Sequence, residues 1–303
     1  MSTMSTLSTK PMMSSHSSAH ALGIIGVGNM GLGMGRAALS AGFRVLGCDI
    51  DPAAIAKAQA AGVALKSSTS ELAAHANTLL IAVVNAAQID TVLADVLPSL
   101  SPAHTVLFMS TVAPKDAARC VAAVCATGAA ALDAPMSGGP ARAAAGELTL
   151  MLAGEPSTIT AASPFTDALA SRCFAVSARA GDAMRAKLLN NLLAGIHLAA
   201  GAQVLNIAAN MGLDAATFLD ITQASSGQSW IAGDRLSRAL AGDFAPRAHL
   251  HILAKDVRLA HALLASDGYP MSMADAALAR FEAGLAAGLA DLDDAALTKL
   301  PLK

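Results

Sequence analysis

The stretch ALGIIGVGNMG, residues 21–31, decides the fold of this chain. Its first five residues form an apolar run that predicts a buried strand. Gly26 allows a tight turn out of that strand because glycine has no Cβ to clash. Gly28 lets the backbone approach a pyrophosphate, and Gly31 lets the following helix pack closely on the sheet. This order of strand, glycine turn and helix predicts a dinucleotide-binding site.

The residues around this turn indicate which dinucleotide fits. The start of the predicted helix offers unpaired N–H groups and a partial positive charge to a phosphate, with Asn29 and Met30 at its mouth. The next apolar run, 43–48, ends at Asp49, where a Rossmann unit places the carboxylate that accepts hydrogen bonds from the adenine ribose. Because a carboxylate repels a 2′-phosphate, the sequence favours NAD over NADP.

Length and composition limit the class of protein. A chain of 303 residues exceeds the usual single-domain size, so two domains are expected. The formal net charge is −2 and no Lys/Arg-rich run occurs, which disfavours a nucleic-acid partner. The apolar stretches 79–84 and 188–205 are too short or too polar for a membrane span. We expect a soluble protein without a membrane or nucleic-acid partner.

The cysteines and histidines show no metal-binding pattern. The cysteines lack C-x-x-C or zinc-type spacing, and reduced thiols suit a cytoplasmic protein: Cys48, Cys120, Cys125 and Cys173. His249 and His251 are two residues apart with no third ligand at helical spacing, so no metal site is expected. Residues 1–20 contain no apolar core of signal-peptide length and are interpreted as a disordered tail or a misassigned start.

Residues 21–181 alternate short apolar runs with alanine-rich helical segments. This alternation predicts a Rossmann-type doubly wound, mostly parallel α/β sheet, with strands at 23–25, 44–48, 78–84, 105–108, 130–133 and 148–153. A single long helix is expected over 182–211, opened by Gly181 and closed by Gly212. Shorter helices are expected at 214–225, 231–240, 248–266 and 273–288. We predict an NAD-binding domain over 21–181 and an all-helical substrate and oligomerisation domain over 182–303, joined by the long helix.

Small polar residues follow three of the predicted strands. Binding sites in doubly wound sheets lie beyond the carboxyl ends of the strands, where a ribose or nicotinamide would pass Asn85 and the pair Ser110-Thr111. Either place can equally be an ordinary loop. The third is DAPMSGGP, residues 133–140, a glycine turn that presents backbone N–H groups together with the Ser137 hydroxyl, which suits a carboxylate. No Gly-x-Ser-x-Gly pattern surrounds Ser137, so it is not a nucleophile.

Two lysines stand out in the helical half. Lys187 and Asn191 are four residues apart and share one face of an otherwise apolar helix. The Lys187 ammonium can snorkel to solvent, or it can be a desolvated acid/base with a lowered pKa. Lys255 and Asp256 are neighbours on a predicted helix, where adjacent side chains face different directions, so they need not pair.

Four motifs in order carry a family resemblance, over residues 22–297. They are GVGNMG at 26–31, DAPMSGG at 133–139 followed by AAAGELT at 143–149, KLLNN at 187–191, and KD at 255–256. Together they resemble the β-hydroxyacid dehydrogenase family. GQSW at 227–230 and the Asp-Asp pair at 293–294 are similar to the members that oxidise L-threonate. Asn190-Asn191 instead follows the general family pattern, where threonate-type members carry His-Gln.

The resemblance implies NAD-dependent oxidation of a small hydroxy acid, such as L-threonate or a similar four-carbon sugar acid. It makes Lys187 the general acid/base, and Asn191 the residue that holds the substrate hydroxyl or the lysine. It places Lys255 near nicotinamide and substrate, and Thr111 against the cofactor. The substrate carboxylate would bind the glycine turn: Ser137, Gly138 and Gly139.

Other readings of the motifs remain. A reductase of the same fold would act on a short semialdehyde, such as tartronate or succinic semialdehyde, with NADPH, but Asp49 argues against it. An imine reductase carries an acidic or aromatic residue in place of Lys187. A non-catalytic NAD-sensing module would have lost the lysine. The apolar long helix also predicts a partner subunit, in a homodimer or homotetramer.

Overall fold

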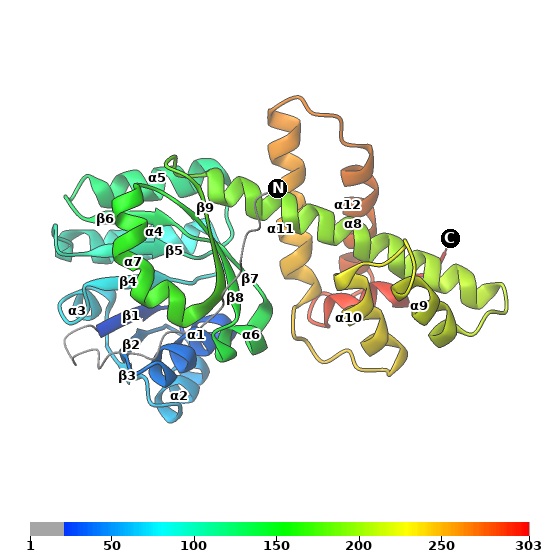
Figure 1. Cartoon of the computed structure of the whole chain (residues 1–303), viewed down its shortest axis with the longest axis horizontal. Helices are drawn as coiled ribbons and strands as arrows, with labels where there is room; N and C mark the ends of the chain where they lie inside the picture. The colour runs from blue at the N-terminus through cyan, green and yellow to red at the C-terminus, as the bar shows by residue number, and fades with distance from the viewer. Residues whose placement is uncertain (1–20, 303) are drawn as a thin grey trace, which may run out of the picture.

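A computed structural model describes residues 21–302 and shows a sheet-containing part joined to a helical part by one long helix (Figure 1). The predicted tail, 1–20, lies outside the described residues. The sheet has nine strands in the order β3-β2-β1-β4-β5-β6-β8-β7, with β9 also paired to β8. The strands are β1 (Ala21–Ile25), β2 (Arg44–Cys48), β3 (Ala64–Leu65), β4 (Thr78–Ile81), β5 (Thr105–Phe108), β6 (Ala130–Asp133), β7 (Met136–Ser137), β8 (Leu148–Ala153) and β9 (Ala170–Ser177).

The six strands from β3 to β6 run parallel, and β8 is antiparallel to both β6 and β7. Successive residues of each parallel strand face opposite sides of the sheet. Ile24 therefore packs into one buried cluster with Leu80, while Ile25 and Ile81 pack into another. Helices cover both faces, as the alternating sequence pattern predicts: α1 (Asn29–Ser40), α2 (Pro52–Ala60), α3 (Thr69–Ala73), α4 (Ala86–Val96), α5 (Pro114–Cys125), α6 (Gly139–Ala145) and α7 (Pro156–Leu169).

The predicted strand bounds are correct except in two places. The strand expected over 23–25 begins earlier, at Ala21. The strand expected over 78–84 ends at Ile81, and the chain beyond it already leaves the sheet. Three strands were not expected. β3 and β7 have two residues each, and β9 lies next to β8 with residues 171–176 exposed. The apolar run 173–176 of β9 did not reveal this strand, because β9 follows α7 directly at Ala170 with no turn residue to mark the boundary.

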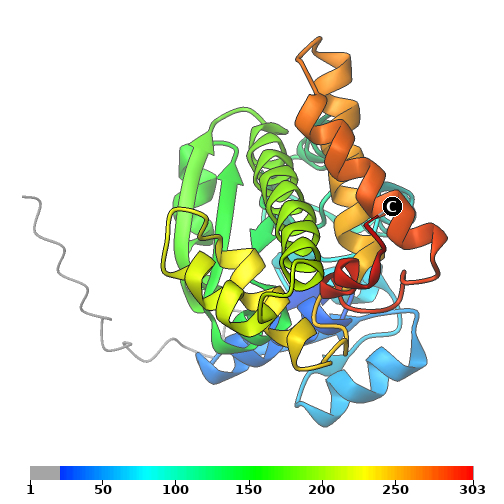
Figure 2. The same ribbon diagram turned by 90° about the vertical axis from the view of Figure 1, so that its right-hand side faces the viewer.

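The long predicted helix is confirmed as α8 (Asp182–Asn210). The helices after it are also confirmed with small shifts at their ends: α9 (Ala215–Gln223), α10 (Trp230–Leu240), α11 (Leu250–Ser266) and α12 (Ser272–Ala286). Figure 2 shows α8 with α11 and α12 on one side and the last strands of the sheet on the other. By length and composition alone α8 could cross a membrane, and it contacts both the sheet and the other helices of the chain.

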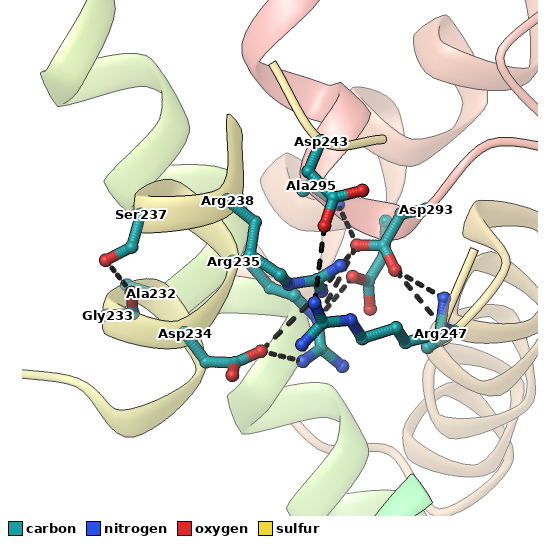
Figure 3. A network of polar contacts seen from close by, with 12 residues as sticks. Ala232, Gly233, Asp234, Arg235, Ser237, Arg238, Asp243, Arg247, Asp293 and Ala295 are labelled. Carbon is teal, nitrogen blue, oxygen red and sulfur yellow. Dashed lines mark hydrogen bonds and ion pairs between the residues drawn. The ribbon is translucent and has the colours of Figure 1, made fainter. Parts of the chain in front are cut away.

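The Asp-Asp pair singled out in the sequence has a structural role. Asp293 is fully buried and its Oδ1 accepts a hydrogen bond of 2.8 Å from Arg238 on α10 (Figure 3). Asp294 Oδ1 accepts from Arg235 Nε at 2.5 Å. Asp293 Oδ2 accepts the backbone N–H of Arg247. These ion pairs fasten the short helix η2 (Asp294–Lys299) to α10 and to the start of α11, away from the strand ends.

Candidate active site

The glycine turn after β1 leaves an open cradle at the start of α1. Gly31 packs so closely on the strand that a Cβ there would lie 1.9 Å from the Gly26 carbonyl oxygen. Gly26 itself has a φ of +91°, which favours glycine. At Gly28, by contrast, an added Cβ would meet nothing within 4 Å, and no side chain caps the helix there. The free N–H groups of the first turn, beside Asn29 and Met30, therefore fit a pyrophosphate.

Asp49 lies beside this cradle, as its position after β2 predicts. Its Oδ2 accepts a hydrogen bond of 2.7 Å from the backbone N–H of Val27, inside the glycine turn. Its Oδ1 accepts from the N–H groups of Ile50 and Asp51 at 2.7 and 3.0 Å. The backbone thus holds a negative charge against the turn, where it can accept ribose hydroxyls and oppose a 2′-phosphate.

The polar residues after β4 and β5 also make structural contacts. Asn85 caps α4, since its Oδ1 accepts the N–H of Gln88 at 2.9 Å. Buried Ser110 ties the two strand ends together, because its Oγ accepts the N–H of Val83 at 2.9 Å. Thr111, the next residue, offers its carbonyl oxygen to the helical part of the chain. Asn85 therefore caps a helix, as a residue of an ordinary loop can, and it also lies near the strand ends.

The predicted glycine turn follows β6. Met136 and Ser137 pair with β8, and the chain then turns sharply at Gly138 and Gly139, whose φ angles are +142° and +76°. Residues with a Cβ rarely adopt these angles. A Cβ at Gly139 would meet nothing within 4 Å, so the backbone on that side is open. The turn presents N–H groups beside the Ser137 hydroxyl, as a carboxylate site requires.

Asp133 connects this turn to α8. It is fully buried, and its Oδ2 accepts the N–H groups of Gly181 and Met184 at 2.8 and 3.1 Å. Burial raises the pKa of Asp133 to about 6, against the lowering effect of these hydrogen bonds. The same short segment therefore caps the helix that carries Lys187 and forms the glycine turn. In the sequence Asp133 stands in the DAPMSGG motif, with no role predicted for it.

Lys187 is buried in α8, with 6% of its surface exposed. Burial lowers the pKa of its ammonium, the charge of Asp256 opposes this shift and the charge of Lys255 adds to it, and together they bring the pKa to about 8. Within residues 21–302 no ion pair neutralises the ammonium. The sequence left two interpretations of Lys187 open, a side chain that reaches solvent and a desolvated acid/base. Its burial favours the second, in which the amine can exchange a proton near neutral pH.

Asp256 joins the other polar side chains around Lys187. It is 4% exposed, and its Oδ2 accepts a hydrogen bond of 2.7 Å from Asn191 Nδ2. Its Oδ1 accepts from Lys255 Nζ at 2.6 Å, and the same ammonium donates to the Thr111 carbonyl oxygen at 2.9 Å. Their positions on the helix do not require Lys255 and Asp256 to pair, but the structure shows that they form an ion pair. One carboxylate thus links α8, α11 and the loop after β5.

Asp256 was not among the expected site residues. In the sequence it appears in the KD motif at 255–256, as an acidic residue in an apolar helical stretch, with no role predicted for it. Such a residue needs a partner when buried, but the partner depends on how α8 and α11 pack. The structure brings Lys187, Asn191, Lys255 and Thr111 into one neighbourhood through Asp256.

Comparisons with known proteins agree with this arrangement. A family model for the NAD-binding domain of 6-phosphogluconate dehydrogenase matches residues 21–177. A second model, for the NAD-binding domain of NADP-dependent 3-hydroxyisobutyrate dehydrogenase, matches residues 181–301. L-threonate dehydrogenase of Escherichia coli K12 is 32% identical over 92% of this chain and 94% of its own length.

Two solved structures are similar over almost the whole chain. A 3-hydroxyisobutyrate dehydrogenase from Salmonella typhimurium has a TM-score of 0.86 at 35% identity, covering 92% of this chain and 99% of its own. Psf3, solved with NADP⁺ and 2-OPP, has a TM-score of 0.84 at 25% identity, covering 92% and 98%. The chain therefore matches relatives of its own length through both of its parts.

Proposed function

Because this chain belongs to the NAD-binding hydroxyacid dehydrogenase family that contains the L-threonate and 3-hydroxyisobutyrate dehydrogenases, we propose that it oxidises a small four-carbon sugar acid such as L-threonate. The observation that carries the proposal is the buried, unpaired Lys187 beside the Asp256 network. A dehydrogenase needs a base for the hydroxyl proton, and Lys187 is the group whose pKa suits that task.

The cofactor is a nicotinamide dinucleotide, and we propose NAD rather than NADP. The cradle at Gly28 accommodates the pyrophosphate, while Asp49 opposes a 2′-phosphate. Asn85 and Thr111 lie at strand ends on the route to the helical part, where the nicotinamide ribose would pass.

In the proposed mechanism a bound NAD supplies the hydride acceptor. The chain holds the substrate carboxylate with Ser137 and the N–H groups of Gly138 and Gly139. Neutral Lys187 accepts the hydroxyl proton as the carbon gives up its hydride, so the hydroxyl becomes a carbonyl and the amine becomes an ammonium. Asn191, fixed by Asp256, orients the hydroxyl or the amine. In the reverse direction the Lys187 ammonium returns the proton.

Lys255 has two proposed contacts. Its ammonium lies at the junction of the two parts of the chain, hydrogen-bonded to Thr111, where both nicotinamide and substrate would come close. Its positive charge would also help keep the nearby Lys187 neutral. It therefore supports the base as well as binding the ligands.

We propose that the two parts of the chain, which meet near Gly181, have different functions. Residues 21–181 would bind the cofactor, and residues 182–303 would contribute the base and form the subunit interface. Exposed apolar side chains follow one side of α8, each 38–53% exposed: Leu189, Leu193, Val204 and Ile207. At 3.6 residues per turn they form one stripe, which a second copy of the chain would cover in a homodimer or homotetramer. All four cysteines are free, which suits the reducing cytoplasm.

A substrate panel tests the proposal. The rate of NADH formation would be measured with L-threonate, D-threonate, erythronate, 3-hydroxyisobutyrate and D-glycerate, and each assay repeated with NADP. Turnover confined to a four-carbon acid with NAD is expected. Activity only with NADPH and a short semialdehyde would contradict the proposal and identify the chain as a reductase of the same fold.

A further inference from the structure

Two histidines and one aspartate meet on the surface of the helical part. His249 directly precedes α11 and His251 lies in its first turn, while Asp291 lies 42 residues away from His249, in the loop before η2. One ligand atom from each of the three residues lies within 4.8 Å of the others. The two imidazole rings are stacked, with centroids 5.1 Å apart. No metal site was expected from the sequence because no third ligand stands at helical spacing, and in the fold Asp291 is a third candidate ligand.

Backbone carbonyl oxygens determine which nitrogen of each imidazole ring carries the hydrogen. His249 Nδ1 lies 3.0 Å from the carbonyl oxygen of Asp291, and His251 Nδ1 lies 2.9 Å from that of Ala290. A carbonyl oxygen can only accept, so each Nδ1 carries the hydrogen. In the neutral ring the lone pair is then on Nε2. A backbone carbonyl that orients the far nitrogen in this way is the usual support of a metal-ligating histidine.

We propose that His249, His251 and Asp291 bind a divalent transition-metal ion, with Zn²⁺ as the best match. Two imidazoles and one carboxylate suit Zn²⁺ far better than Mg²⁺, which prefers oxygen ligands. With metal–ligand distances of about 2.0–2.1 Å, tetrahedral ligand atoms lie about 3.3 Å apart. Asp291 Oδ1 now lies 3.8 Å from His251 Nδ1, and because the Asp291 side chain is 93% exposed it can rotate toward Nε2 while both rings keep their backbone hydrogen bonds. Water would complete the coordination.

The ion would clamp two segments that already touch. The N–H of Leu250 donates to the Leu292 carbonyl oxygen at 2.9 Å, and the N–H of His251 donates to that of Ala290 at 3.2 Å. A metal across the same junction would pin the first turn of α11, one turn before Lys255. Its expected role is structural, because binding to the folded state alone raises stability.

Calorimetric titration of Zn²⁺ into the chelator-treated full chain tests the site. We expect one Zn²⁺ site that weakens at least about tenfold in H249Q, in H251Q and in D291N. We also expect Zn²⁺ to raise Tm by roughly 5 °C at a hundredfold excess over its dissociation constant. Mg²⁺ should give neither effect. Tm without metal shows that each variant is folded.

H261Q is the matched control, because His261 also lies on α11 against a carboxylate, 2.8 Å from Asp275, but has no second histidine beside it. Its Zn²⁺ affinity should equal that of the unmodified chain. Two results would overturn the proposal: no Zn²⁺ binding by the unmodified chain, or the same isotherm in the H249Q/H251Q variant. The second result would assign binding to other groups, such as His16, His20 or the free cysteines.

Discussion

At Lys187, burial and two neighbouring charges of opposite sign set the pKa of the ammonium. Burial is the largest influence and lowers the pKa to about 8, so the amine is partly deprotonated near neutral pH. The oxidation rate should therefore rise with pH through about 8, where the base becomes neutral. Lys187 depends on its surroundings for this property, because an exposed lysine would stay protonated at the same pH.

Asp256 is a positioning residue whose charge raises the pKa of Lys187. In Asp256→Asn this influence is removed, so the pH at which oxidation reaches half of its maximal rate should move lower. Turnover should also fall several-fold, because Asn191 and Lys255 lose their charged partner. The pH profile of kcat/KM measures both effects. Asp275→Asn, which neutralises an exposed carboxylate, should leave the profile in place. If the pH profile of Asp256→Asn did not move, Asp256 would have no influence on the pKa of Lys187, and its role would be limited to packing.

Asp49 should decide between the two nicotinamide cofactors. Asp49→Ser removes the carboxylate beside the glycine turn, so kcat/KM with NADP should rise relative to NAD by about tenfold, equivalent to about 1.4 kcal/mol. Asp51→Asn neutralises a neighbouring carboxylate and should leave the ratio unchanged. An equal ratio in Asp49→Ser and the unmodified chain would mean that the ribose lies elsewhere.

At the scale of single elements, we expect two glycines of the turn between β1 and α1 to have different roles, Gly31 in folding and Gly28 in binding NAD. Gly31→Ala would place a Cβ 1.9 Å from the Gly26 carbonyl oxygen and should lower the free energy of unfolding by about 1–3 kcal/mol or more. Gly28→Ala meets no protein atom within 4 Å, so its Tm should stay near that of the unmodified chain while its affinity for NAD falls. Thermal unfolding and NAD titration of both variants check this. Full NAD affinity in Gly28→Ala would contradict the placement of the pyrophosphate.

The sequence predicts elements well where local chemistry defines them. The helix over 182–210 begins after Gly181 and ends just before Gly212, and buried strands such as β1 appear as apolar runs. The strand β9 was missed although residues 173–176 are apolar, because no turn residue separates it from α7. Of the site, the glycine turns and Lys187 could be singled out from the chain. The contacts of Asp256 and the approach of Asp291 to two histidines depend on tertiary packing, which local patterns do not contain.

At the scale of the whole molecule, α8 serves both halves. Its start is capped by Asp133 from the sheet, it carries Lys187 near that end, and its remaining length forms the core of the helical part. The apolar stripe on its outer side is the surface that we propose a second subunit covers. The position of the base relative to the cofactor cradle is thus fixed by one helix that both parts hold.

The stripe predicts the oligomeric state. Light scattering should show a dimer or tetramer at micromolar concentration, and Leu193→Glu should convert it toward monomer by placing a charge in the apolar interface. Gln59→Glu adds the same charge at an exposed polar position of α2, outside the stripe, and should leave the assembly intact. If the unmodified chain were a monomer, the proposal that a second copy covers the stripe would be wrong.

The most direct test of the central claim is turnover of a four-carbon sugar acid with NAD in Lys187→Ala. We predict that kcat falls by about 10²–10⁴-fold, the contribution of a general base, while the dissociation constant for NAD stays nearly unchanged. Undiminished turnover in a folded Lys187→Ala enzyme would show that another group takes the hydroxyl proton.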